Sequence, residues 1–147
     1  MTRSRPPAPL ALALPLLLGV ALPAQAATSQ VVLVGLVNNT DGSQAMTLDH
    51  HSVAKGVVTF KVANQSKDED HEFLVVKTTL EPSKFPMTKD GARVDEKKLS
   101  GIKELGDLKP GKTGDLKLRL QPGRYVLFCN DPGHFTAGMH ATLTVTG

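Results

Sequence analysis

The chain has 147 residues, of which 17 are basic, 14 are acidic and only 4% are aromatic. No stripe of basic residues interleaved with aromatic ones is visible, which argues against nucleic-acid binding. The formal charge of +3 includes Arg3 and Arg5, and without them 15 basic residues stand against 14 acidic ones. The charged residues are therefore best interpreted as a solvated surface.

Residues 1–26 have the features of a secretory signal peptide. Arg3 and Arg5 provide a positive start, residues 10–22 are apolar, and residues 24–26 read Ala-Gln-Ala, a small-x-small cleavage site. The apolar stretch is too short and too interrupted by proline to span a membrane. We therefore expect cleavage before Ala27, a secreted or periplasmic protein without a membrane span, and a single domain over residues 27–147.

Seven strands are predicted in the remainder of the chain, at residues 30–37, 46–53, 57–63, 71–77, 116–120, 123–129 and 140–146. In residues 57–63, Val58, Phe60 and Val62 share one face and are expected in the core. Residues 80–106 are the least regular part, with a short helix expected at 95–99. Many short strands with frequent turns predict an all-β protein, an antiparallel Greek-key β-sandwich.

Tyr125, the only tyrosine, follows a Pro-Gly turn at the start of the predicted strand 123–129. Greek-key sandwiches often carry a tyrosine corner here, in which the hydroxyl bonds to the backbone a few residues upstream. Tyr125 shares strand parity with Leu127 and Cys129, so all three should point inward. We predict a structural role for this tyrosine and no redox role.

The loop at residues 129–139 carries the strongest chemical signal. It holds Cys129, the only cysteine, His134 five residues later and Met139 five beyond that. Glycine and proline hinges allow such a loop to fold back over its first residue. A thiolate, an imidazole and a thioether together suit copper better than magnesium or calcium. A lone cysteine in an exported chain could instead be an inert buried thiol. The presence of His134 and Met139 in the same loop favours a metal ligand.

A trigonal copper site needs a second imidazole, and His71 is the candidate. An acidic stretch precedes it, which is also typical of a surface histidine. However, His71 shares strand parity with Phe73 and Val75, which favours an inward position. Met139 has a simpler interpretation as a core filler, because methionine is flexible.

Three further histidines, His50, His51 and His140, could suggest a second metal. The strand parity of His51 and His140 points them to solvent, and His50 fits the edge of the core. We therefore expect one metal.

The pattern Cys-x4-His-x4-Met, with Pro-Gly-His and Gly-Met inside it, resembles the cupredoxins, small blue copper proteins of the plastocyanin and azurin kind. The loop is most similar to that of rusticyanin-like proteins, and the resemblance covers about residues 46–147. It implies a cupredoxin-like sandwich with one type 1 copper held by His71, Cys129, His134 and a weak axial Met139. Two departures stand out. Glu72 replaces an asparagine that ties two loops together in many members, and residues 81–103 match nothing in the family.

The resemblance implies an exported electron carrier that cycles copper between Cu(I) and Cu(II) and is not an enzyme. Transient redox partners are expected to dock near His134 and Phe135, on an apolar patch supplied by the loop, and the protein is expected to be a monomer. The alternative is a periplasmic copper-trafficking or storage protein, which would favour exchangeable sites rich in Met and His. A copper enzyme would need a second copper bound by several further histidines, a cluster not seen in this sequence.

Overall fold

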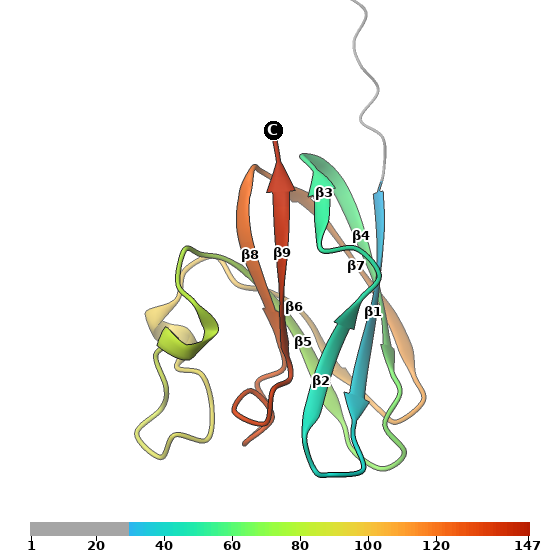
Figure 1. Cartoon of the computed structure of the whole chain (residues 1–147), viewed down its shortest axis with the longest axis vertical. Coiled ribbons are helices and arrows are strands. Elements are labelled where there is room, and N and C mark those ends of the chain that lie inside the picture. Colours follow the sequence, from blue (N-terminus) through green and yellow to red (C-terminus); the bar gives the residue numbers. More distant parts are fainter. Residues whose placement is uncertain (1–29) are drawn as a thin grey trace, which may run out of the picture.

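The computed structural model describes residues 30–147, in which two β-sheets pack face to face (Figure 1). The first sheet has the order β2 (Gln44–Leu48), β1 (Gln30–Asn38), β4 (Gly56–Asn64) and β7 (Thr113–Leu120). The second has the order β3 (Ser52–Ala54), β9 (His140–Thr146), β8 (Gly123–Phe128), β5 (His71–Lys77) and β6 (Lys103–Leu108). The predicted β-sandwich is confirmed, whereas the predicted signal peptide lies outside the described residues.

The strand pairing differs from the prediction in three respects. The pairs β1–β4 and β3–β9 are parallel, so the sheets are mixed and not wholly antiparallel. The predicted strand 46–53 is two strands, because β2 pairs with β1 in one sheet and β3 pairs with β9 in the other. Strand β6 was not predicted. A register shift interrupts its pairing with β5, and Gly106 there has a φ of 81°, so the period-two pattern is broken.

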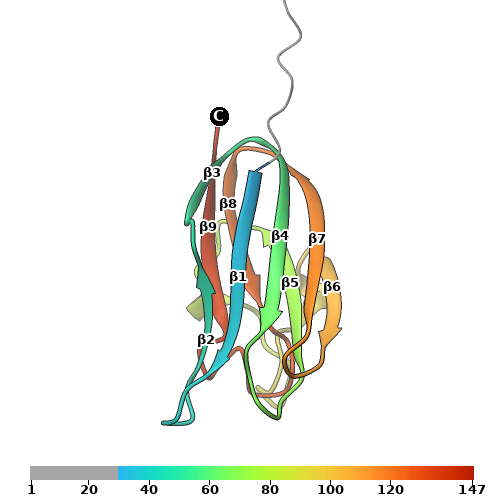
Figure 2. The same ribbon diagram turned by 90° about the vertical axis from the view of Figure 1, so that its right-hand side faces the viewer.

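The core lies between the two sheets and follows the predicted alternation. Val58, Phe60 and Val62 are buried, as their shared parity on β4 implied. Figure 2 shows β1, β4 and β7 running side by side as one layer. Tyr125 forms the expected corner: its hydroxyl donates to the Gln121 carbonyl at 2.9 Å and accepts from the Gln121 N–H at 3.1 Å.

Residues 78–102, here called the excursion, leave the sandwich between β5 and β6 and lie beside β8 (Figure 1). They contain two short 3-10 helices, η1 (Pro82–Lys84) and η2 (Glu96–Lys98), and η2 lies where a short helix was expected. The excursion covers the outer face of the second sheet through a separate apolar cluster, formed by Leu74, Val76, Phe85, Val94, Val126, Phe128 and Phe135. Within residues 30–147, no helix is long and apolar enough to cross a membrane.

Candidate metal centre

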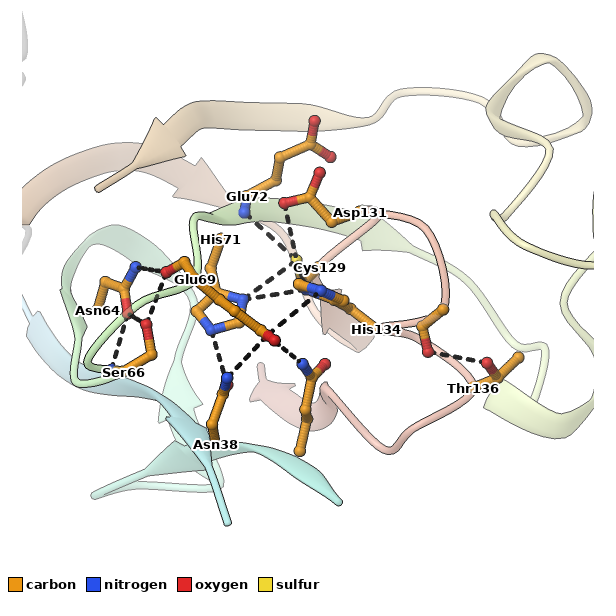
Figure 3. Close-up of polar contacts among 12 residues, drawn as sticks. Asn38, Asn64, Ser66, Glu69, His71, Glu72, Cys129, Asp131, His134 and Thr136 are labelled. Carbon is orange, nitrogen blue, oxygen red and sulfur yellow. Dashed lines mark hydrogen bonds and ion pairs between the residues drawn. The ribbon is translucent and has the colours of Figure 1, made fainter. Parts of the chain in front are cut away.

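The two histidines and the cysteine singled out from the sequence converge at one end of the sandwich (Figure 3). His71 begins β5, Cys129 directly follows β8, and His134 lies in the loop between β8 and β9. Because β5 and β8 are antiparallel neighbours, the start of one lies beside the end of the other. Cys129 Sγ is 3.9 Å from His71 Nδ1 and 3.5 Å from His134 Nδ1, and the two Nδ1 atoms are 3.1 Å apart.

These separations fit a metal in trigonal coordination. Metal–nitrogen bonds of about 2.0 Å and a metal–sulfur bond of about 2.3 Å, at 120°, place the nitrogens about 3.5 Å apart and each nitrogen about 3.7 Å from sulfur. The observed distances of 3.1, 3.5 and 3.9 Å lie close to these values. Two imidazoles and one thiolate are the equatorial donor set of a blue copper site.

The protonation states of the buried candidate ligands also suit a metal. Burial lowers the pKa of His71, so its imidazole is neutral at pH 7 and has a free lone pair. Burial raises the pKa of Cys129 to about 12, so without metal it is a thiol that must lose its proton when a metal binds. The backbone N–H of Glu72 donates to the Cys129 sulfur at 3.3 Å and would stabilise the resulting negative charge.

The hydrogen bonds of Asn38 determine which ring nitrogen of His71 carries the proton. The other ring nitrogen then presents a lone pair toward the Cys129 sulfur. A Glu69 carboxylate oxygen accepts a hydrogen bond, so the atom of Asn38 that contacts it at 2.7 Å is the amide Nδ2. The Asn38 Oδ1 therefore faces His71 Nε2 at 2.9 Å, and this nitrogen carries the proton. The Nδ1 atom of His71 is left free to bind a metal. Asn38 was not singled out from the sequence, because it directly follows the predicted strand 30–37 and belongs to no recognised motif.

The loop folds Met139 back toward the cysteine, as its two hinges predicted. Cys129 N–H donates to the Met139 carbonyl at 3.1 Å, and the Met139 side chain is fully buried in the same core cluster as Cys129. Gly138 has a φ of 107°, and a Cβ there would lie 2.7 Å from the Gln44 carbonyl oxygen. A glycine is therefore required at the point where the loop passes β2.

The excursion is attached to the residue after the cysteine. Asn130 is 2% exposed; its Oδ1 accepts from Val94 N–H at 2.7 Å, and its Nδ2 donates to the Val94 carbonyl at 3.1 Å and to Glu96 Oε1 at 2.6 Å. Arg93 donates to the Asn130 carbonyl at 2.7 Å and lies 4.0 Å from the Glu72 carboxylate. Asn130 thus connects the loop at residues 129–139 to the excursion. The sequence did not predict this contact, because residues 81–103 had no recognisable pattern.

Comparison with known proteins establishes the family. Residues 35–146 match the model of the copper binding proteins of the plastocyanin/azurin family. The chain belongs to this family. As a cupredoxin it binds copper, and the donor set described above fits that metal.

Solved cupredoxin structures share the fold. Auracyanin B has 23% identity over 84% of this chain and 93% of its own, with a TM-score of 0.57. Auracyanin from Roseiflexus castenholzii has 21% identity over 83% and 99%, with a TM-score of 0.53. Rusticyanin from Thiobacillus ferrooxidans has 16% identity over 80% and 77%, with a TM-score of 0.62. A search of curated protein sequences finds no match.

The prediction that Phe135 belongs to an exposed apolar patch beside His134 is wrong. Phe135 is 6% exposed, because it stacks on Phe85 at 5.3 Å between ring centroids and meets Phe128 edge to face. The sequence could not show this because Phe85 comes from the excursion. The His134 side chain is 15% exposed, and the hollow beside it is lined mainly by acidic residues, namely Asp68, Glu69, Asp70 and Asp131, together with Pro132.

The other three histidines of the cupredoxin do not belong to the cluster of His71, Cys129 and His134. His50 follows β2 and is exposed, 3.0 Å from Asp49 Oδ2, so it does not occupy the core edge where it was expected. His51 is exposed as predicted. His140 is half-buried instead of solvated, because its ring packs 5.0 Å from Phe135. Within residues 30–147, the one cluster of at least three potential ligand side chains is His71, Cys129 and His134.

Proposed function

We propose that this cupredoxin is an exported electron carrier with a single type 1 copper. His71, Cys129 and His134 would be the equatorial ligands, and Met139 the distant axial ligand. Bound copper would supply the chemistry by gaining and losing one electron between Cu(I) and Cu(II). The observation that carries the proposal is the convergence of Sγ and two Nδ1 atoms within 3.9 Å of one another at the end of the sandwich.

The surroundings of the ligands favour electron transfer over catalysis. His71, Cys129 and Met139 are fully buried, so a substrate has no approach to the metal past these residues. His71 and Cys129 are held at strand ends, and Asn38 and Asn130 anchor the neighbouring segments. A stiff ligand set changes little between the two oxidation states, which keeps the reorganisation during electron transfer small.

The proposed route for the electron is His134, whose side chain is 15% exposed. Redox partners would dock around it through a small, short-lived interface. The acidic residues beside it favour a partner with a basic face, which would speed encounter at low ionic strength. Export would depend on residues 1–26. The intact mass of the protein isolated from its native host would test this, because a processed chain should begin at Ala27.

The decisive experiment is the absorption spectrum of the copper-loaded protein. A blue site should give a strong band near ~600 nm, and Cys129→Ser should lose it while its circular dichroism stays that of a folded sandwich. A variant that kept the band would contradict the ligand assignment. Copper retained over many redox cycles would support a carrier. Copper that left on reduction, or passed readily to a copper-free acceptor protein, would favour the trafficking alternative.

A further inference from the structure

The outer nitrogens of the two histidines have partners of different kinds. An imidazole that binds a metal through Nδ1 and stays neutral carries its proton on Nε2. His71 Nε2 lies 2.9 Å from Asn38 Oδ1, while His134 Nε2 lies 3.6 Å from Glu69 Oε2. Each outer nitrogen therefore lies beside an oxygen atom, at hydrogen-bond distance for His71 and at ion-pair distance for His134.

These two acceptors are joined to each other. The same Glu69 oxygen accepts from Asn38 Nδ2 at 2.7 Å and from Gln44 Nε2 at 2.9 Å. Asn38 ends β1 and Gln44 begins β2, so the carboxylate is held from the first sheet although its side chain is 47% exposed. Figure 3 shows Glu69 extending past His71 toward His134, with Asn38 beside it.

We propose that Glu69 is a positioning residue for His134, and that Asn38 and Glu69 form one polar support for both copper-binding imidazoles. A metal-bound histidine whose second N–H meets a carboxylate is fixed in orientation and is a more basic ligand. The negative charge also stabilises Cu(II) more than Cu(I). Glu69 therefore lowers the reduction potential and covers the edge of His134 through which the electron would leave. This inference rests on the proposed copper ligands.

The distance of 3.6 Å between Glu69 and His134 is longer than a direct hydrogen bond, so the contact acts mainly through charge. A simpler interpretation is that Glu69 contributes only as one of several acidic residues in its loop. Asp68 separates the two interpretations, because it is adjacent and exposed and also lines the hollow beside His134. Within residues 30–147, its side chain makes no hydrogen bond or ion pair.

The test compares Glu69→Gln with the matched control Asp68→Asn, since each removes one negative charge from the same loop. At a fixed solution potential, Glu69→Gln should lower the ratio of Cu(II) to Cu(I) by about tenfold, and Asp68→Asn by less than about threefold. A second measurement follows the exchange of the His134 Nε2 proton with water by NMR in the Cu(I) protein. This exchange should be faster in Glu69→Gln and unchanged in Asp68→Asn.

Equal changes in the two variants, or unchanged proton exchange in Glu69→Gln, would overturn the role of Glu69 and leave the proposed function intact. A wild-type protein that binds no copper through Cys129 would overturn both, because His134 Nε2 then has no fixed proton. If Glu69→Gln changes both the ratio of Cu(II) to Cu(I) and the proton exchange more than Asp68→Asn does, the proposed role of Glu69 is supported.

Discussion

Replacing Asn130 with alanine should destabilise the copper-free protein by about 2–6 kcal/mol. The Asn130 amide bonds to both the N–H and the carbonyl of Val94, and Val94 is itself buried. Each buried backbone group left without a partner costs about 1–3 kcal/mol. The Glu96 carboxylate, which also bonds to Asn130, is partly exposed and would be rehydrated at little cost. A loss of this size is a large part of the roughly 5–15 kcal/mol that stabilises a typical domain.

The assay is urea unfolding of the copper-free protein followed by circular dichroism, because the chain has no tryptophan and a single tyrosine. Asn39→Ala is the matched control: its amide bonds only to the exposed Ser43 hydroxyl, and its loss should cost less than about 0.5 kcal/mol. Hydrogen exchange of the Val94 amide should also accelerate in Asn130→Ala. A change in unfolding free energy below about 1 kcal/mol, or no greater than that of the control, would refute the idea that this amide holds the excursion to the metal loop.

Three further predictions follow from individual contacts. Tyr125→Phe should cost about 1 kcal/mol in unfolding free energy, because the hydroxyl loses its two bonds to Gln121; an unchanged urea midpoint would contradict this. Met139→Leu should stay folded and blue with a higher potential in voltammetry, since the proposed axial thioether is removed at nearly constant volume. Burial raises the pKa of Cys129 from 9.0 to about 12, so the folded state keeps its thiol proton to a higher pH than the unfolded state does. The stability of the copper-free protein should therefore fall as the pH rises from about 9 toward 12, and Cys129→Ser should lack this fall in urea unfolding.

The features that were predictable from the sequence are those that depend on near neighbours in the chain. Strand alternation placed Phe60 and Phe73 in the core and Tyr125 at its corner, because side chains two residues apart share a face whatever the strand pairs with. The spacing within residues 129–139 brought His134 beside Cys129 because a short hinged loop has few ways to close. His71 was chosen as a candidate because a trigonal copper site requires a second imidazole, and its strand parity correctly placed it inside the sandwich.

The supporting contacts depended on how distant segments pack. Alternation within residues 46–53 could not show that the two halves join different sheets, since pairing partners are not encoded in a local period. Phe135 is buried because Phe85, 50 positions away in the chain, stacks on it. Asn38 and Glu69 meet the two histidines only because the end of β1 lies beside the loop before β5. Local spacing and strand parity therefore determined which residues are candidate copper ligands. Tertiary packing determined which side chains surround those candidates, because hydrogen-bond partners far apart in sequence are brought together only when the sheets assemble.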